Sequence, residues 1–138
     1  ELSRRLDDSE PGVRSILEDK NGYIWLSNFI SKYKIVADSS TQYRKLPGMD
    51  PSNEFLKGKL PYFNSGLTDN NNDLWMTSYG GGVWKYDGEI LSNYPVMDGE
   101  TEALLISIYQ DNQGILWLGT QHSGVYKYNG SGFEKFEP

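Results

Sequence analysis

The stretch that decides the fold runs from Ser107 to Thr120 and reads S-I-Y-Q-D-N-Q-G-I-L-W-L-G-T. It holds an apolar segment, an Asp-x-x-Gly turn and a second apolar segment that contains a tryptophan. Asp at the first position and Gly at the last position are favoured in a type I turn. The stretch therefore predicts two short antiparallel strands joined by a tight turn, and residues 15–27, S-I-L-E-D-K-N-G-Y-I-W-L-S, repeat the pattern.

The whole chain is built from three copies of this unit, marked by Trp25, Trp75 and Trp117. Residues 65–88 placed on residues 107–130, a shift of 42 without gaps, give 10 identities in 24 positions. A shift of 50 aligns five residues of the first copy with identical residues of the second copy. Internal repeats of this period indicate an architecture of stacked units.

The first copy differs from the other two in its loops. Aligning Tyr33 with Tyr86 leaves three residues missing after Trp25, so the glycine loop Gly80–Gly82 has no counterpart there. The tryptophans are 50 and then 42 residues apart, which predicts an insertion loop over residues 47–61, a stretch with three prolines.

Each copy predicts four short strands with a second turn, Asp87-Gly88 or Asn129-Gly130, in which both residues tolerate a positive φ and suit a tight hairpin. We expect an all-β protein made of β-propeller blades, that is, three four-stranded antiparallel sheets, because such units bury their faces only by stacking. Another all-β sandwich is the alternative. The expected boundaries are blade 1 at 13–46, blade 2 at 62–96 and blade 3 at 103–136.

Three blades do not close a ring, since propellers use roughly four to eight. We expect a fragment of a larger propeller or a partial ring closed by oligomerisation, either the remainder of a larger propeller or a homodimer. The chain begins at Glu1, which we expect to be a fragment boundary, and Leu2–Leu6 predict an outer strand of a preceding or partner blade.

Composition excludes several classes of function. The chain has 138 residues, no cysteine, one histidine and a formal net charge of −6. Its negative charge disfavours nucleic acid, and the lack of cysteine excludes disulfides and thiolate metal sites. Apolar runs are too short for a membrane span, so we expect no membrane contact within this segment.

Two motifs come close to a ligand site and miss it. Asp69-x-Asn71-x-Asp73 supplies the first three ligands of a calcium loop, but Leu74 stands where glycine is required. Gly80–Gly82 has neither the dinucleotide spacing nor the P-loop lysine. We therefore expect ordinary turns, and no metal or other cofactor.

The candidate ligand-binding residues are Phe29, Tyr79, Gln121 and His122, in the loops between second and third strands. In a propeller these loops share one end with the connections between blades, here near Asp50 and Asp98–Glu102. Aromatic, amide and carboxylate side chains on such loops suit a polyol ligand, and ordinary hydrophilic loops explain them equally well.

We expect Trp25, Trp75 and Trp117 to form the structural core between blades, since they recur at one strand position. Truncation of Trp75 or Trp117 to alanine is then expected to destabilise the fold by roughly 3–5 kcal/mol. Sugar stacking on these rings is the alternative.

The two units quoted at the start, with Gly124–Gly130 and Gly82–Gly88, resemble the two-component regulator propeller repeat. This resemblance implies the extracytoplasmic sensor domain of a hybrid two-component histidine kinase of the Bacteroidetes type, whose members often sense glycan breakdown products. The second copy departs from the pattern with Asn72-Asp73 in place of glycine, and the first departs by its shorter loop.

The resemblance implies a non-enzymatic, periplasmic ligand-sensing segment, with an oligosaccharide as ligand and any kinase outside this chain. No Ser-elbow motif is present, so we expect no catalytic residues. The alternatives are a propeller enzyme, such as a lyase or glycosidase, and a purely structural or protein-binding propeller.

Overall fold

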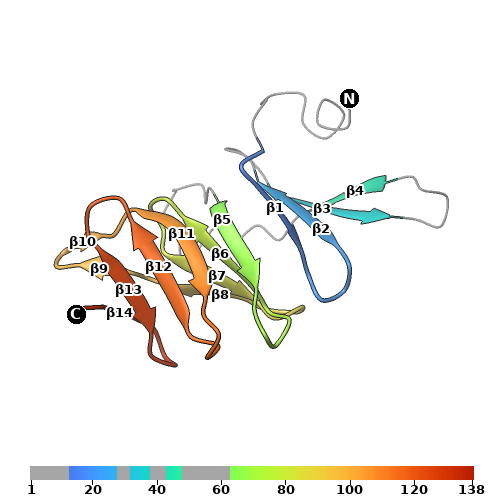
Figure 1. Ribbon diagram of the computed structural model, residues 1–138. Coiled ribbons are helices and arrows are strands. Elements are labelled where there is room, and N and C mark those ends of the chain that lie inside the picture. The colour runs from blue at the N-terminus through green and yellow to red at the C-terminus, as the bar shows by residue number, and fades with distance from the viewer. Residues whose placement is uncertain (1–12, 28–31, 38–42, 48–62) are drawn as a thin grey trace.

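The computed structural model describes residues 13–27, 32–37, 43–47 and 63–138. Within these ranges the chain forms strands, turns and loops, and no helix (Figure 1). The prediction of an all-β chain is confirmed. Of the expected features, the insertion loop, except for Pro47, and the strand at Leu2–Leu6 lie outside the described residues.

Three four-stranded antiparallel sheets follow one another in sequence order, as expected for blades (Figure 1). A two-stranded hairpin joins the second sheet to the third. The first sheet holds β1 (Ser15–Glu18), β2 (Ile24–Ser27), β3 (Lys32–Ala37) and β4 (Tyr43–Pro47). The second holds β5 (Phe63–Thr68), β6 (Leu74–Ser78), β7 (Val83–Tyr86) and β8 (Leu91–Tyr94). The hairpin is β9 (Met97–Asp98) and β10 (Thr101–Glu102), and the third sheet holds β11 (Leu105–Gln110), β12 (Leu116–Thr120), β13 (Val125–Tyr128) and β14 (Phe133–Lys135).

The first strands of the three sheets lie next to one another, β1 beside β5 and β5 beside β11. Polar groups tie them together, since Ser15 Oγ donates to the carbonyl of Phe63 (3.4 Å) and Asn64 Nδ2 donates to the carbonyl of Leu105 (2.7 Å). The sheets therefore stack face to face around a shared inner edge, as propeller blades do.

One aspartate organises the start of every blade. Asp69 Oδ1 accepts hydrogen bonds from the backbone N–H groups of Asn71 (2.8 Å) and Asp73 (2.9 Å), and its Oδ2 accepts from Trp75 Nε1 (2.8 Å). Asp19 and Asp111 bind their own turns and tryptophans in the same way, with carboxylate–indole distances of 2.7 and 2.8 Å. We call this arrangement the Asp–Trp clamp. It fixes the turn and the tryptophan ring with one side chain.

The clamp turn closes as the Asp-x-x-Gly pattern predicts. The N–H of the fourth residue donates to the aspartate carbonyl at 2.9 Å in all three copies. The fourth residue has a left-handed backbone, with φ of 74° at Gly22 and 83° at Gly114. Asn72 fills this position in the second copy with φ of 61°, which asparagine tolerates better than most side chains. The second copy therefore keeps the turn without glycine.

The core lies between the sheets, and the clamped tryptophans of the first two blades contact the next blade. Trp25 packs on Tyr86 with ring centroids 5.0 Å apart, and Trp75 packs on Tyr128 at 5.3 Å. Both tryptophans are buried. Their other contacts form two apolar layers, one of Phe63, Leu74, Met76 and Trp84 and one of Val83, Val96, Leu105, Leu116, Leu118 and Tyr126.

Trp117 departs from the expected core role. It is only half-buried, with its ring against Phe136 of its own blade (5.2 Å). The physical reason is its place on the last sheet, because no sheet among the described residues covers the face to which its ring belongs. The indole keeps its clamp, and this hydrogen bond is the largest of the effects that hold the pKa of Asp111 below its usual value.

The strand register corrects the predicted alignment of the first blade. Trp25 pairs with Lys34, nine residues on, whereas Trp75 pairs with Lys85, ten residues on. The loop of the first copy is therefore one residue shorter, not three, and Tyr33 does not match Tyr86. Lys34 thus takes the strand position of Lys85 and Lys127, whose ammonium groups lie over the rings of Trp75 and Trp117 at 5.3 and 5.6 Å.

The second turns are wider than the predicted tight hairpins. Tyr86 pairs with Leu91, which leaves a four-residue loop, and Asp87 Oδ1 accepts from the N–H groups of Glu89 (2.9 Å) and Ile90 (2.7 Å). Only the glycine of the Asp87-Gly88 pair has a positive φ, at 101°. The aspartate side chain caps the backbone instead of adopting the left-handed conformation.

Replacing Asp69 by asparagine is expected to lower the free energy of unfolding by about 1–3 kcal/mol, because asparagine replaces one of the two acceptor oxygens by an NH2 donor, so either the turn N–H groups or the indole N–H lose their acceptor. Urea unfolding followed by fluorescence measures the change. Asn71→Ala, an exposed change in the same turn, is the control and should have little effect. Equal midpoints for the two variants would show that the clamp contributes no stability.

Trp75→Ala is expected to destabilise by about 3–5 kcal/mol, as truncation of a buried aromatic does, because Trp75 is 2% exposed. Trp117→Ala should cost clearly less, since part of its ring is already in water. Parallel thermal and urea unfolding of both variants tests the difference. A larger loss for Trp117→Ala would contradict the packing described above.

Gly82 and Gly124 are equivalent positions with φ of 74° and 77°, so alanine strains both backbones, by about 1–2 kcal/mol. At Gly82 a Cβ would also collide with the carbonyl oxygen of Tyr94 and lie 3.1 Å from Pro95 Cα, while nothing lies within 4 Å at Gly124. Gly82→Ala should therefore unfold at a lower urea concentration than Gly124→Ala. Equal effects would mean that the Tyr94 carbonyl moves aside freely.

Candidate functional site

The loops between second and third strands lie at one end of the sheets, together with the link between blades. We call this the connection end, formed by residues 79–82, 95–104 and 121–124. The N–H of Gln121 donates to the carbonyl of Leu104 (2.9 Å), so the third-blade loop touches the link directly. Variable loops on a rigid sheet scaffold are where binding residues commonly lie.

Two of the predicted site residues meet across neighbouring blades. The Tyr79 hydroxyl donates to Gln121 Oε1, although 42 residues separate them in the sequence. Tyr79 remains 42% exposed, so one side of its ring is open to a ligand. An aromatic ring beside an amide is a pair that can stack on a sugar and bind its hydroxyl groups at once.

The backbone of both loops is held by hydrogen bonds at their bases. The N–H of Ser78 donates to the carbonyl of Gly82 (3.0 Å), and Asn93 Nδ2 donates to the carbonyl of Gly81 (2.9 Å). In the third blade, Thr120 Oγ1 donates to the carbonyl of Gly124 (2.7 Å). Tyr79 and Gln121 are therefore presented from fixed positions, which lowers the entropic cost of binding.

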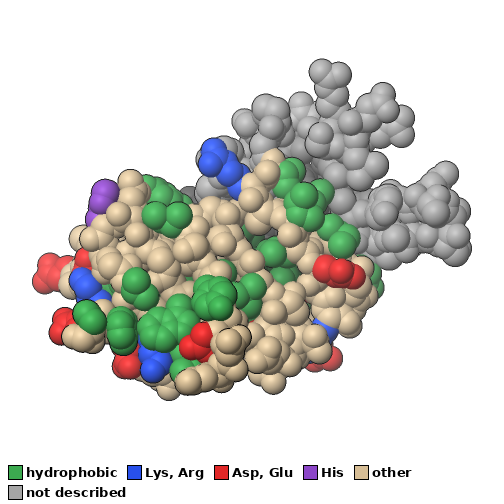
Figure 2. Space-filling model, in the orientation of Figure 1, with side chains coloured by type: hydrophobic (Ala, Val, Ile, Leu, Met, Phe, Trp, Pro, Cys, Tyr) green, Lys and Arg blue, Asp and Glu red, His purple; other side chains and the backbone are tan. Residues whose placement is uncertain are grey.

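Of the other predicted site residues, one is exposed and the rest lie outside the described residues. His122 is exposed next to Gln121 in the sequence, and as the single histidine it is the purple side chain in Figure 2. Phe29 and Asp50 lie outside the described residues. The structure thus brings together Tyr79 and Gln121, with His122 adjacent.

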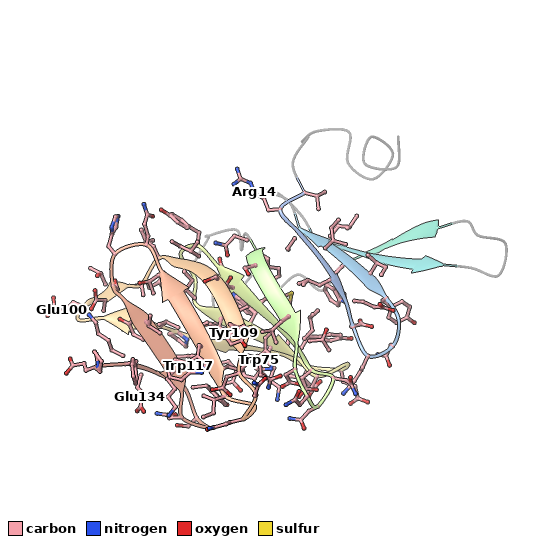
Figure 3. The ribbon with its side chains drawn as sticks, viewed as in Figure 1. Arg14, Trp75, Glu100, Tyr109, Trp117 and Glu134 are labelled. Carbon is pink, nitrogen blue, oxygen red and sulfur yellow. The ribbon has the colours of Figure 1, made fainter. Side chains whose placement is uncertain are left out.

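The hairpin β9–β10 binds two groups of the third blade, Ser123 and Lys135, that the sequence reasoning did not name. Hydrogen bonds from the Ser123 side chain and from Lys135 hold the pKa of Asp98 below its usual range, and Lys135 Nζ lies 3.0 Å from Asp98 Oδ1. Glu100, at the tip of the hairpin, points away from the sheets (Figure 3). The acidic residues of the segment Asp98–Glu102 indicated from the sequence that carboxylates lie at this end, but the sequence did not indicate their partners on the third blade.

The opposite end of the sheets carries a polar hollow that is a weaker candidate. It is lined by Lys20, Asn21, Asp87, Gly88 and Glu89. Asp87 already accepts backbone hydrogen bonds from Ile90 and Glu89, which lower the pKa of its carboxyl, and Lys20 lies 3.6 Å from Asp73. The charged groups there serve the turns and the blade junction.

The calcium-like loop of the second blade is occupied by protein donors. Both carboxylate oxygens of Asp69 accept N–H groups, and Asp73 forms an ion pair with Lys85 (2.8 Å), which raises the pKa of that lysine. Among the described residues no group of three metal-ligating side chains is placed to hold an ion. These aspartates are structural.

Comparison with known proteins agrees with this fold. Residues 8–29 and 101–122 match the model of the family described as "Two component regulator propeller". These ranges cover the beginning of the first and of the third blade. No curated protein matches the chain.

The solved structures that are similar to it include the following two. Streptogramin B lyase has a TM-score of 0.65 and 18% identity over 94% of this chain, an identity at which only the fold is shared. The extracellular domain of a protein assigned as a hybrid two component system of B. thetaiotaomicron has a TM-score of 0.42 and 17% identity over 85% of the chain. The chain spans 42% and 21% of their lengths, less than half of each.

Among the described residues, no helix is long and apolar enough to cross a membrane. The Asp–Trp clamp recurs in all three sheets, and the family matches begin two of them. Residues 8–29 and 101–122 are therefore similar to the two-component regulator propeller repeat, and the described residues have an all-β, blade-like fold.

Proposed function

We propose that this chain is a non-enzymatic, ligand-sensing propeller segment of a two-component signalling protein, located outside the cytoplasm. The family match supports the signalling context. The observation that carries the sensing proposal is the contact between Tyr79 and Gln121 at the connection end, because it joins the loops of two neighbouring blades.

A ligand bound at this contact would touch both blades at once. The blades are themselves rigid, since backbone and side-chain hydrogen bonds fix each loop to its own sheet. Binding therefore acts on the contact between the loops more than on the loops themselves. Such a change in the spacing of two rigid units is a signal that a histidine kinase in the same system can read.

We propose a neutral oligosaccharide as the ligand. Sugars offer a flat apolar face for the exposed Tyr79 ring and hydroxyl groups for the Gln121 amide and for His122. The chain carries a formal net charge of −6, which disfavours sulfated or uronic-acid sugars. The outward-pointing Glu100 places one of these negative charges at the same end.

The lyase similarity does not change this proposal, since at 18% identity it concerns the fold. The acids of the hairpin and His122 are the groups that an enzyme at this end would use. Mass spectrometry of an oligosaccharide after incubation with the protein distinguishes the two functions. An unchanged mass is expected, and cleaved products would overturn the non-enzymatic function.

Gln121→Ala is expected to weaken binding of a neutral oligosaccharide of four to six sugars at least tenfold, in calorimetric titrations against a panel of such sugars. Gln113→Ala is the matched control, because Gln113 is an exposed glutamine in the clamp turn at the opposite end. Its affinity should equal that of the parent. Equal losses in both variants, or tighter binding of sulfated sugars, would contradict the proposed site.

A further inference from the structure

The turn between β13 and β14 surrounds one asparagine side chain with hydrogen-bond donors. Asn129 Oδ1 accepts from the N–H and from the hydroxyl of Ser131, both at 3.0 Å, and from the N–H of Gly132, also at 3.0 Å. Asn129 Nδ2 donates to Oε2 of Glu134 on the outer strand β14 (3.1 Å). An amide oxygen has two lone pairs, so three donors fully occupy it. The side-chain carbonyl of Asn129 is therefore strongly polarised.

The three donors are placed as in an oxyanion hole. If a nucleophile attacked Asn129 Cγ, negative charge would develop on Oδ1, which already accepts two backbone N–H groups and one hydroxyl. Donors that are fixed before the reaction stabilise such a tetrahedral intermediate, because they do not have to reorient as the charge appears. The turn thus lowers the barrier for attack on this amide carbon.

The residue that follows supplies the nucleophile. The backbone nitrogen of Gly130 can close a succinimide ring on Asn129 Cγ. Gly130 has a φ of 98°, and a Cβ added there would meet nothing within 4 Å. Glycine has no side chain that would obstruct this approach, and its backbone rotates more freely than that of other residues. The pair Asn129-Gly130 therefore combines an activated carbonyl with an unhindered nitrogen.

The equivalent turn of the second blade shows which features are particular to this one. Gly88 occupies the position of Gly130, but a Cβ there would collide with Lys20 of the preceding blade. Asp87 stands in place of Asn129, and its Oδ1 also accepts two backbone N–H groups. A carboxylate therefore fits this turn, and hydrolysis of the Asn129 amide would give the side chain that the second blade already has.

The chain contains a second Asn-Gly pair, Asn21-Gly22, in the clamp turn of the first blade. There the Gly22 N–H donates to the carbonyl of Asp19 (2.9 Å), and the Asn21 N–H donates to Asp19 Oδ1 (2.9 Å). The Gly22 nitrogen cannot turn toward Asn21 Cγ without opening the clamp. Because the two pairs have the same covalent chemistry, a difference in their reactivity comes from the folded structure.

We propose that Asn129 is a self-modification site, at which the folded turn promotes deamidation. The Gly130 nitrogen attacks Asn129 Cγ and loses its proton, the Cγ–Nδ2 bond breaks, and Nδ2 takes up a proton and leaves as ammonia. Glu134, hydrogen-bonded to the leaving nitrogen, is the group placed to deliver that proton. Water then hydrolyses the cyclic imide to aspartate or isoaspartate. This modification is independent of ligand binding at the connection end.

Peptide mapping by mass spectrometry, after incubation of the folded protein in mildly alkaline buffer, tests the site. The peptide that contains Asn129 should show the mass gain of an exchange of NH2 for OH, at a rate about tenfold above that at Asn21. In urea the two rates should become similar, because only the shared Asn-Gly chemistry then remains. Equal rates in the folded protein, or a faster reaction at Asn21, would overturn the proposal.

Two variants at exposed positions test the roles of the turn side chains. Ser131→Ala removes the hydroxyl donor, and Glu134→Gln keeps an acceptor for Nδ2 but cannot deliver a proton, so each should slow the reaction at Asn129 severalfold in the folded protein and leave the rate in urea unchanged. Glu89→Gln is the matched control, because Glu89 is an exposed carboxylate in the equivalent turn of the second blade. Its rates should equal those of the parent.

The direction of the Ser131→Ala effect is decisive. A faster reaction in this variant would mean that the donors hold the asparagine away from attack, and the proposal would be wrong. Unchanged rates in both Ser131→Ala and Glu134→Gln would also overturn it, since the reaction would then owe nothing to the turn.

Discussion

The bond between a turn aspartate and the indole N–H of a tryptophan six residues later is the interaction on which the blades depend. One carboxylate satisfies two turn N–H groups and holds the ring, so the turn, the second strand and the junction to the next blade share a single anchor. A buried carboxylate needs such donors to offset the loss of water. Because its requirement is met locally, the same anchor is available to each blade.

This locality explains why most of the fold could be predicted from the sequence. Asp69 and Trp75 lie close along the chain, and the strands around them follow from alternation and turn residues. The first-blade register could not be read with equal certainty, because Tyr33 and Ile35 flank Lys34 and either side of it offers a plausible match to Tyr86. Pairing of that lysine with Trp25 settles it. The exposure of Trp117 could not be predicted either, since burial depends on a neighbouring sheet and not on the repeat.

The candidate site was predictable to the same extent. Tyr79 and Gln121 occupy equivalent loops of adjacent blades, so repeat alignment alone placed them near each other. Lys135 and Ser123 bind Asp98 of the hairpin from another strand and another loop. No local sequence pattern predicts contacts between residues so far apart in the chain. Residues in equivalent loops can thus be found by aligning copies, whereas contacts between unlike elements require the coordinates.

The self-contained clamp also bears on how such chains grow and shrink in evolution. The hydrogen bonds that close the turn and hold the tryptophan lie within one blade, so a blade needs only a complementary sheet face from its neighbour. The tandem copies here have the same kind of face. Duplication or deletion of one whole copy then leaves every remaining clamp intact, and only the number of units changes. The stability of stacked repeats is approximately a sum over units and their nearest-neighbour interfaces. The number of blades can therefore change while the hydrogen bonds within each blade stay the same.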